Sequence, residues 1–195
     1  MQQNINFQIL SVLIFINSFL NLNAMAQTEK QQYSLLHKNG AFEIRRYEPA
    51  VMASVEMPGT YSNMSSTGFR ELAGYIFGGN QEKKKIAMTA PVHVAMSDST
   101  STMSFVMPSV YEIDDLPVPL SEDIRLHETG MAITASISFG GYANDKKIEQ
   151  KTEELRHLLR SRGIHYKDDF RFLGYNPPYR IINRQNEIVV TLFGN

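Results

Sequence analysis

The chain has 195 residues, a formal net charge of -1 and hydrophobic residues at 43% of its positions. This length and composition fit one domain with a hydrophobic core, and the near-neutral charge argues against a dedicated nucleic-acid binder. The absence of cysteine excludes disulfides, zinc–cysteine sites, iron–sulfur clusters and a thiol nucleophile.

The N-terminus has the features of an export signal. Residues 9–22 form an apolar run of about 14 residues, which is typical of a signal peptide and short for a bilayer span. Ala24-Met25-Ala26 matches the A-x-A cleavage pattern. We therefore expect a signal peptide at residues 1–26, a mature domain at 27–195, a periplasmic or secreted location, and no stable membrane span after cleavage. Because the first eight residues contain no lysine or arginine, an uncleaved anchor remains the alternative.

The first structural elements are predicted between residues 42 and 77. Residues 42–57 predict a strand region that Pro49 interrupts, and residues 62–67 predict a polar turn. Two sets of side chains alternate in the first strand, namely Phe42, Ile44 and Arg46 against Glu43, Arg45 and Tyr47. An amphipathic helix follows, with apolar residues at helical spacing: Phe69, Leu72, Ala73, Ile76 and Phe77.

The elements predicted in the first half of the chain return in the same order in the second half. Gly78-Gly79 ends the first helix, and residues 86–96 and 102–107 predict a hairpin. In the second half, residues 124–139 predict a strand region, and Asn144 is a good N-cap for a second helix that Gly163 ends. Its helical stripe comprises Ile148, Thr152, Leu155, Leu158 and Leu159. Two further strands are predicted at residues 170–175 and 188–193, with a hairpin turn formed by Asn183, Arg184, Asn186 and Glu187.

These elements make two β-α-β-β units that are offset by about 80 residues, and one such unit cannot bury its sheet face alone. Hairpins dominate over crossover helices. We therefore predict an α+β fold in which the duplicated units form a distorted antiparallel β-barrel flanked by two helices.

The same segments resemble the SOUL haem-binding family. The resemblance rests on FEIRRYEPAVMASVE, TGFRELAGYIFGGN, KKKIAMTAPV and FRFLGYNPPYRIINRQNEIVV, in this order, and covers roughly Tyr33 to Phe193. It implies a duplicated β-α-β-β barrel, similar to the effector-binding domains of some bacterial regulators. It also implies non-covalent binding of haem or a related tetrapyrrole in a cleft beside the first helix and the Pro177-Pro178 loop.

A tetrapyrrole needs an apolar wall and basic partners for its propionates. The resemblance places the wall on the first helix, and our candidates are Leu72, Tyr75, Ile76 and Met88. The alternative, which fits the helix stripe better, is that it only packs against the sheet. Arg180 and Arg70 are the candidate propionate partners, while Lys83, Lys84 and Lys85 fit either a gate or a solvated loop.

The iron ligand is the least supported part of the site. Some family members carry histidine where this chain has Arg46, and a guanidinium has no free lone pair for iron. His93 is the remaining candidate, although strict alternation places it on the strand face opposite Val92 and Val94. Ligation by methionine, or by no protein group, stays open.

Enzyme motifs are absent from the sequence, which contains neither a nucleophile elbow nor H-E-x-x-H. Together with the apolar stripes rich in methionine, the resemblance leads us to expect a non-catalytic haem carrier, buffer or scavenger without catalytic residues. One alternative is an enzyme or effector-binding protein that acts on a small hydrophobic or cationic molecule through a cavity carboxylate. Another is an interaction module without a ligand. The sequence leaves the physiological ligand, the protein partners and the oligomeric state open.

Overall fold

A computed structural model of the chain describes residues 28–96, 100–177, 180 and 182–193. The predicted signal peptide and its cleavage site at Ala26/Gln27 lie outside the described residues. None of the described helices combines the length and the apolar character needed to cross a membrane.

Nine strands form one antiparallel sheet in the order β2-β3-β9-β11-β10-β6-β7-β4-β8. Their bounds are β2 Tyr33–Asn39, β3 Phe42–Tyr47, β4 Ala50–Pro58, β6 Val92–Met96, β7 Thr100–Val106, β8 Ile124–Thr129, β9 Ala132–Gly140, β10 Arg171–Gly174 and β11 Gln185–Thr191. A separate parallel pair is formed by β1 (Glu29–Lys30) and β5 (Thr89–Ala90). The helices are α2 (Tyr61–Ile76), α3 (Asp145–Ser161) and the short 3-10 helix η2 (Ile113–Asp115).

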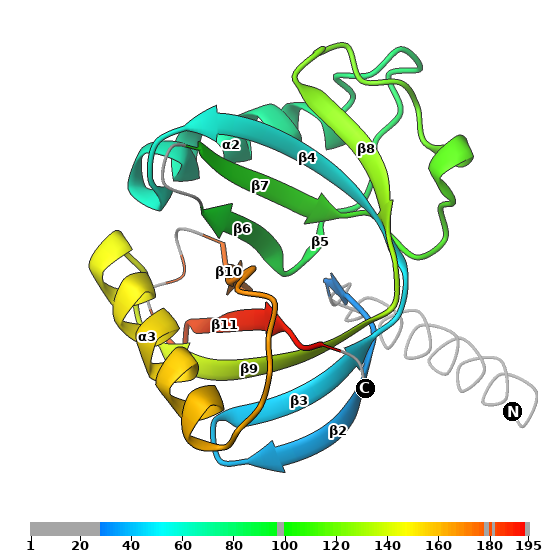
Figure 1. Ribbon diagram of the computed structural model, residues 1–195. Coiled ribbons are helices and arrows are strands. Elements are labelled where there is room, and N and C mark those ends of the chain that lie inside the picture. Colours follow the sequence, from blue (N-terminus) through cyan, green and yellow to red (C-terminus); the bar gives the residue numbers. More distant parts are fainter. Residues whose placement is uncertain (1–27, 97–99, 178–179, 181, 194–195) are drawn as a thin grey trace, which may run out of the picture.

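The sheet confirms the predicted duplication. One unit runs β3-β4-α2-β6-β7 and the other runs β8-β9-α3-β10-β11. The units exchange their first strands, because β3 pairs with β9 and β8 pairs with β4. The segments β3–β4 and β8–β9 therefore cross from one half of the curled sheet to the other (Figure 1), and β6 and β10 join the halves in the middle.

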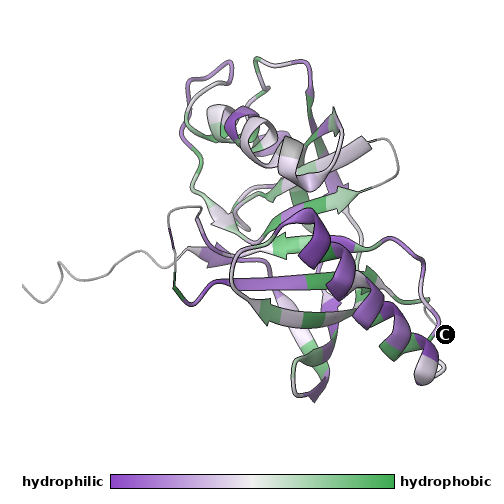
Figure 2. Ribbon diagram, turned by 90° about the vertical axis from the view of Figure 1, so that its left-hand side faces the viewer, coloured by the Kyte–Doolittle hydropathy of each residue, from purple (hydrophilic) through white to green (hydrophobic). Residues whose placement is uncertain are grey.

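Both helices cover the same face of the sheet. Helix α2 packs on β4 and β7, and α3 packs on β9 and β11. Figure 2 views this side, with hydrophobic strand segments between the two helices. The core beneath them is apolar and includes Phe105, Ile137, Leu155, Leu159 and Ile188. Burial of these side chains on one face of each strand is the main force that holds the helices in place.

The predicted turn at residues 62–67 is wrong, because α2 begins at Tyr61 and includes this segment. The first turn of α2 contains no acidic residue. Asp145 of α3 supplies the missing cap from another part of the chain. Its carboxylate accepts hydrogen bonds from the Ser62 backbone N–H and the Thr60 hydroxyl, both at 3.1 Å.

Other strands also differ from the sequence prediction. The strand predicted at residues 86–96 is divided at Pro91, which has no N–H for the sheet, so only 89–90 and 92–96 are strands. Strand β11 begins at Gln185, so Asn186 and Glu187 belong to the strand and not to the turn. The edge strand β2 had not been predicted, because most of its side chains are exposed and lack an apolar alternation.

Candidate functional site

A cleft of about 710 Å³ lies between α2, the β6–β10 junction and the loop that precedes α3. Its floor is formed by strand residues from both repeats, and α2 forms one wall. The lining residues are Tyr61, Ser62, Ser65, Ser66, Phe69, Arg70, Ala73, Val92, Val94, Met103, Tyr142, Ala143, Phe172, Gly174, Asn176 and Arg184. A volume of this size is typical of a small-molecule site.

Aromatic and aliphatic side chains make the cleft mainly apolar. The ring of Tyr61 packs against Phe172 with centroids 5.0 Å apart, and Phe69 packs against Phe105 at 5.2 Å. Burial raises the pKa of Tyr61, so its phenol is neutral at physiological pH. These contacts give a wall of ring faces and aliphatic groups, which suits a flat apolar ligand.

Among the described lining residues, Arg70 and Arg184 are the charged ones, and both are cations. Arg184 is held in position by its loop, because its Nη1 donates to the carbonyl oxygens of Pro177 at 3.1 Å and Arg180 at 2.9 Å. Its guanidinium also lies over the Tyr142 ring, 4.7 Å from the centroid. A cation held in this way is well placed to meet a carboxylate of the ligand.

The structure brings one of the predicted basic residues to the cleft. Arg70 lines its wall on α2. Arg180 is exposed and lies outside the lining, and its Nε donates to the Ile182 carbonyl at 3.3 Å. Arg184, four positions further along the same loop, lines the cleft in its place.

The predicted wall residues Leu72, Tyr75 and Ile76 are not part of the cleft lining. All three are at most 1% exposed and pack in the core beneath α2. Burial raises the pKa of Tyr75 to about 12, and its hydroxyl donates to the Pro117 carbonyl at 3.0 Å. Met88 packs against the same core and also lies outside the lining. The helix turns Phe69, Arg70 and Ala73 toward the cleft instead.

His93 points to the opposite face of the sheet, as the alternation indicates. Its neighbours Val92 and Val94 line the cleft, whereas His93 is buried and its Nε2 lies 2.9 Å from the Gln31 side-chain oxygen. Burial, together with the nearby Arg171 cation, lowers the pKa of His93 to about 3. The structure therefore does not bring this proposed axial ligand to the cleft.

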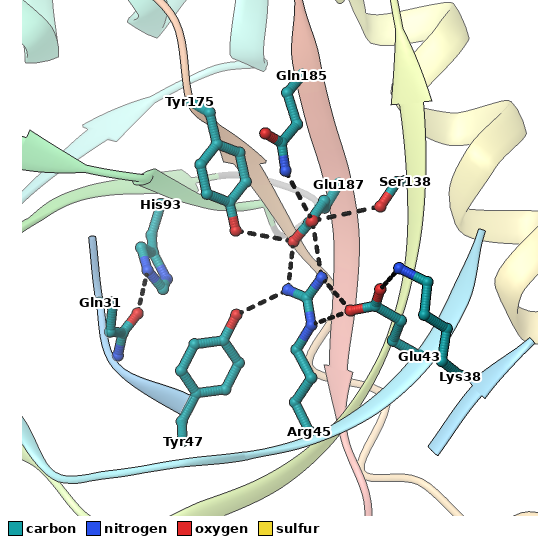
Figure 3. A network of polar contacts seen from close by, with 10 residues as sticks. All are labelled: Gln31, Lys38, Glu43, Arg45, Tyr47, His93, Ser138, Tyr175, Gln185 and Glu187. Carbon is teal, nitrogen blue, oxygen red and sulfur yellow. Dashed lines mark hydrogen bonds and ion pairs between the residues drawn. The ribbon is translucent and has the colours of Figure 1, made fainter. Parts of the chain in front are cut away.

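A buried ionic network on the face opposite the helices had not been predicted (Figure 3). Arg45 on β3 binds Glu187 on β11 through two hydrogen bonds, of 2.6 and 2.9 Å, that reach across β9. Its Nε donates a hydrogen bond of 2.7 Å to one carboxylate oxygen of Glu43, and the Lys38 Nζ donates one of 2.7 Å to the other oxygen. Burial opposes the charge on Arg45, but hydrogen bonding and attraction to Glu187 outweigh it and raise its pKa.

The sequence contained a partial signal for this network. The polar face of the first strand carries Glu43 and Arg45 beside apolar neighbours, which is unusual for a buried strand. Glu187, however, is 142 residues away from Arg45, and no local pattern connects them.

Neither buried carboxylate is free for acid–base chemistry. Glu187 accepts further hydrogen bonds from Tyr175 at 2.9 Å and from Ser138 and Gln185 at 3.3 Å. Burial lowers the acidity of Tyr175 by raising its pKa. Within the described part of the chain, no group of three or more His, Asp or Glu side chains could hold a metal ion. The buried, unpaired glutamate that would favour the enzyme alternative is therefore not found among the described residues.

Comparison with known proteins places the chain in a family. The family model described as SOUL heme-binding protein matches residues 28–191. Human heme-binding protein 2 is 32% identical over 158 residues, which are 76% of this chain and 77% of the human protein. Heme-binding protein 1 of Xenopus laevis is 28% identical over 176 residues, which are 86% and 92% of the two chains.

A solved structure shows the same fold at low identity. The crystal structure of the EcmrR C-terminal domain has a TM-score of 0.59 and 9% identity, covering 84% of this chain and 99% of that one. This likeness establishes the architecture alone. The family match spans nearly all of the described residues and agrees with the duplicated β-α-β-β fold, so the chain belongs to the SOUL heme-binding protein family.

Proposed function

We propose that this protein binds haem or a related tetrapyrrole in the cleft beside α2 and carries, buffers or scavenges it without catalysis. The observation that carries the proposal is the cleft itself, which is mainly apolar, measures about 710 Å³ and has Arg70 and Arg184 as the charged residues of its described lining. The names of the heme-binding relatives support the same ligand class.

The residues of the cleft fit the ligand's chemistry. Phe69, Phe172 and Tyr61 would contact the faces of the apolar macrocycle, while Arg70 and Arg184 would pair with its propionates. Among the described lining residues there is no histidine, and Met103 is the one whose side chain contains sulfur. Affinity would then come from apolar contact and carboxylate pairing, with little contribution from the iron.

The location of the protein is part of the same proposal. Export through residues 1–26 would place the binding domain in the periplasm or outside the cell. An apolar, anionic ligand that crosses such a compartment benefits from a protein that shields its ring. The absence of cysteine means that the domain needs no oxidative folding there.

Titration of the chain from Gln27 with haemin, followed by the Soret band, tests the proposal. We expect saturable binding at micromolar haem, and we expect metal-free protoporphyrin to bind within about tenfold of haem, a difference of ~1.4 kcal/mol. The absence of a saturable shift would rule out the function. A large preference for haem would instead show that the iron is ligated by the protein.

A second titration tests the basic partners. Arg70→Ala and Arg184→Ala are each expected to weaken haem binding by about tenfold, because each removes a charge-assisted hydrogen bond to a propionate. Lys84→Ala is the control, since Lys84 lies outside the cleft and over the Tyr111 ring. Equal affinities for all three variants and the unchanged chain would show that the cleft arginines do not contact the ligand.

A further inference from the structure

The mouth of the cleft carries exposed apolar side chains. Ile182 is 74% exposed and Tyr142 is 55% exposed. Both residues are linked to the arginines of the late loop. The Arg184 guanidinium stacks on the Tyr142 ring and donates to the Arg180 carbonyl. The Arg180 side chain in turn donates to the Ile182 carbonyl. We refer to Tyr142, Arg180, Ile182 and Arg184 as the rim.

The rim is positively charged in a chain whose net charge is negative. The segment from the end of β9 into the first turn of α3, residues 140–146, and the described residues between β10 and β11 together carry three cations, Lys146, Arg180 and Arg184, and one acidic residue, Asp145. Asp145 is already engaged, since its carboxylate caps α2. Arg70 adds a further cation on the cleft wall. Proteins bind the surface of an anionic bilayer with exposed apolar side chains that enter the headgroup region and neighbouring cations that attract the lipid headgroups.

A second exposed apolar pair lacks this combination. Val118 and Leu120 are 56% and 66% exposed, but their segment is flanked by Asp114, Asp115, Glu122 and Asp123. Negative charge at that position would be repelled by anionic lipid headgroups. The charge of the rim, unlike that of the segment around residues 118–120, thus complements such a membrane.

We propose that the rim docks on bilayers that contain anionic lipids, with Ile182 and Tyr142 at the headgroup level and the arginines against the lipid phosphates. Docking there would bring the mouth of the apolar cleft to the membrane surface. A second consequence, which rests on the proposed function, is that the cleft exchanges its apolar ligand directly with the bilayer.

Flotation with vesicles tests the docking without any ligand. The probe is phosphatidylcholine vesicles with about 30% phosphatidylglycerol, compared with pure phosphatidylcholine. The chain from Gln27 is used, because every described strand and helix lies at or after Glu29. We expect binding to the anionic vesicles only, with loss at ~0.5 M salt. Ile182→Asp and Arg180→Glu are each expected to reduce the bound fraction by about fivefold or more.

Two matched variants serve as controls. Val110→Asp places the same charge at a residue that is 78% exposed away from the rim, and Arg160→Glu reverses a charge on α3. Both are expected to bind vesicles like the unchanged chain. Absence of binding to anionic vesicles, or equal effects of Ile182→Asp and Val110→Asp, would overturn the proposal. A dimer in solution that Ile182→Asp dissociates, without vesicle binding, would assign the rim to a second copy instead.

The outcome is separable from that of the proposed function. Ile182 does not line the cleft, so Ile182→Asp is expected to leave haem affinity in vesicle-free solution unchanged. A chain that binds vesicles but shows no Soret shift would contradict haem binding alone. A chain that binds haem but not vesicles would contradict docking alone.

Discussion

Arg45→Met is expected to lower the free energy of unfolding by about 3–5 kcal/mol, because it leaves the buried Glu187 carboxylate without its cation and Glu43 with Lys38 alone. The side chain of Glu187 is 1% exposed and that of Glu43 is 9% exposed, so water cannot replace the lost guanidinium. Methionine keeps the length of the side chain but supplies no donor. Urea unfolding curves of the two chains, analysed for the free energy in water, measure the difference.

The adjacent residue provides a matched control. Arg46 is also an arginine on β3, but its side chain is 45% exposed and its Nε lies 3.6 Å from a Glu48 oxygen. Arg46→Met is therefore expected to change the unfolding free energy by less than about 1 kcal/mol, as is usual for exposed ion pairs. If Arg45→Met cost no more than Arg46→Met, the network would not stabilise the exchanged strand β3.

Ala73→Trp is expected to weaken haem binding by more than tenfold, which is ~1.4 kcal/mol or more. Ala73 lines the cleft from α2, and an indole there would occupy space that the proposed ligand needs. The fold should tolerate the change, since the side chain would extend into the cleft and not into the core. Haemin titration measures the affinity, and urea unfolding checks that stability is retained.

A tryptophan at the neighbouring position, Gly74, is the control. It shows whether weaker haem binding comes from a blocked cleft or from any large side chain added to α2. Gly74 is exposed and lies outside the cleft lining, and a Cβ added there would meet no atom within 4 Å. Gly74→Trp is expected to bind haem like the unchanged chain. Similar affinities for the two tryptophan variants would place the ligand somewhere other than this cleft.

Local patterns predicted several features correctly. The duplicated order of elements and the α+β class followed from periodicity, and Asn144 caps α3 by accepting a hydrogen bond from the Lys147 N–H at 2.9 Å. Strand alternation also indicated that His93 faces away from Val92 and Val94, as the structure has it. These features depend on residues close in sequence, whose geometry is determined by the local backbone.

The residues of the site were predicted less well, because their positions depend on tertiary packing. An amphipathic stripe shows that a helix has an apolar face, but it does not say which of its residues meet the sheet and which border a cleft. Leu72, Tyr75 and Ile76 became core, while Phe69 and Ala73 came to line the cleft. In the late loop, hydrogen bonds to Pro177 and Arg180 hold Arg184 in the cleft lining, whereas Arg180 is exposed.

By itself the sequence therefore determined the repeat and the order of elements, because these follow from local propensity and apolar periodicity. The family was indicated by the resemblance of its motifs and shown by the family comparison. Only the tertiary structure decided which side chains meet across the repeats. Asp145 caps α2 from 83 residues away, and Arg45 meets Glu187 across 142 residues. Both contacts arise because the two units exchange strands and pack their helices on one face, which joins groups that no spacing along the chain connects.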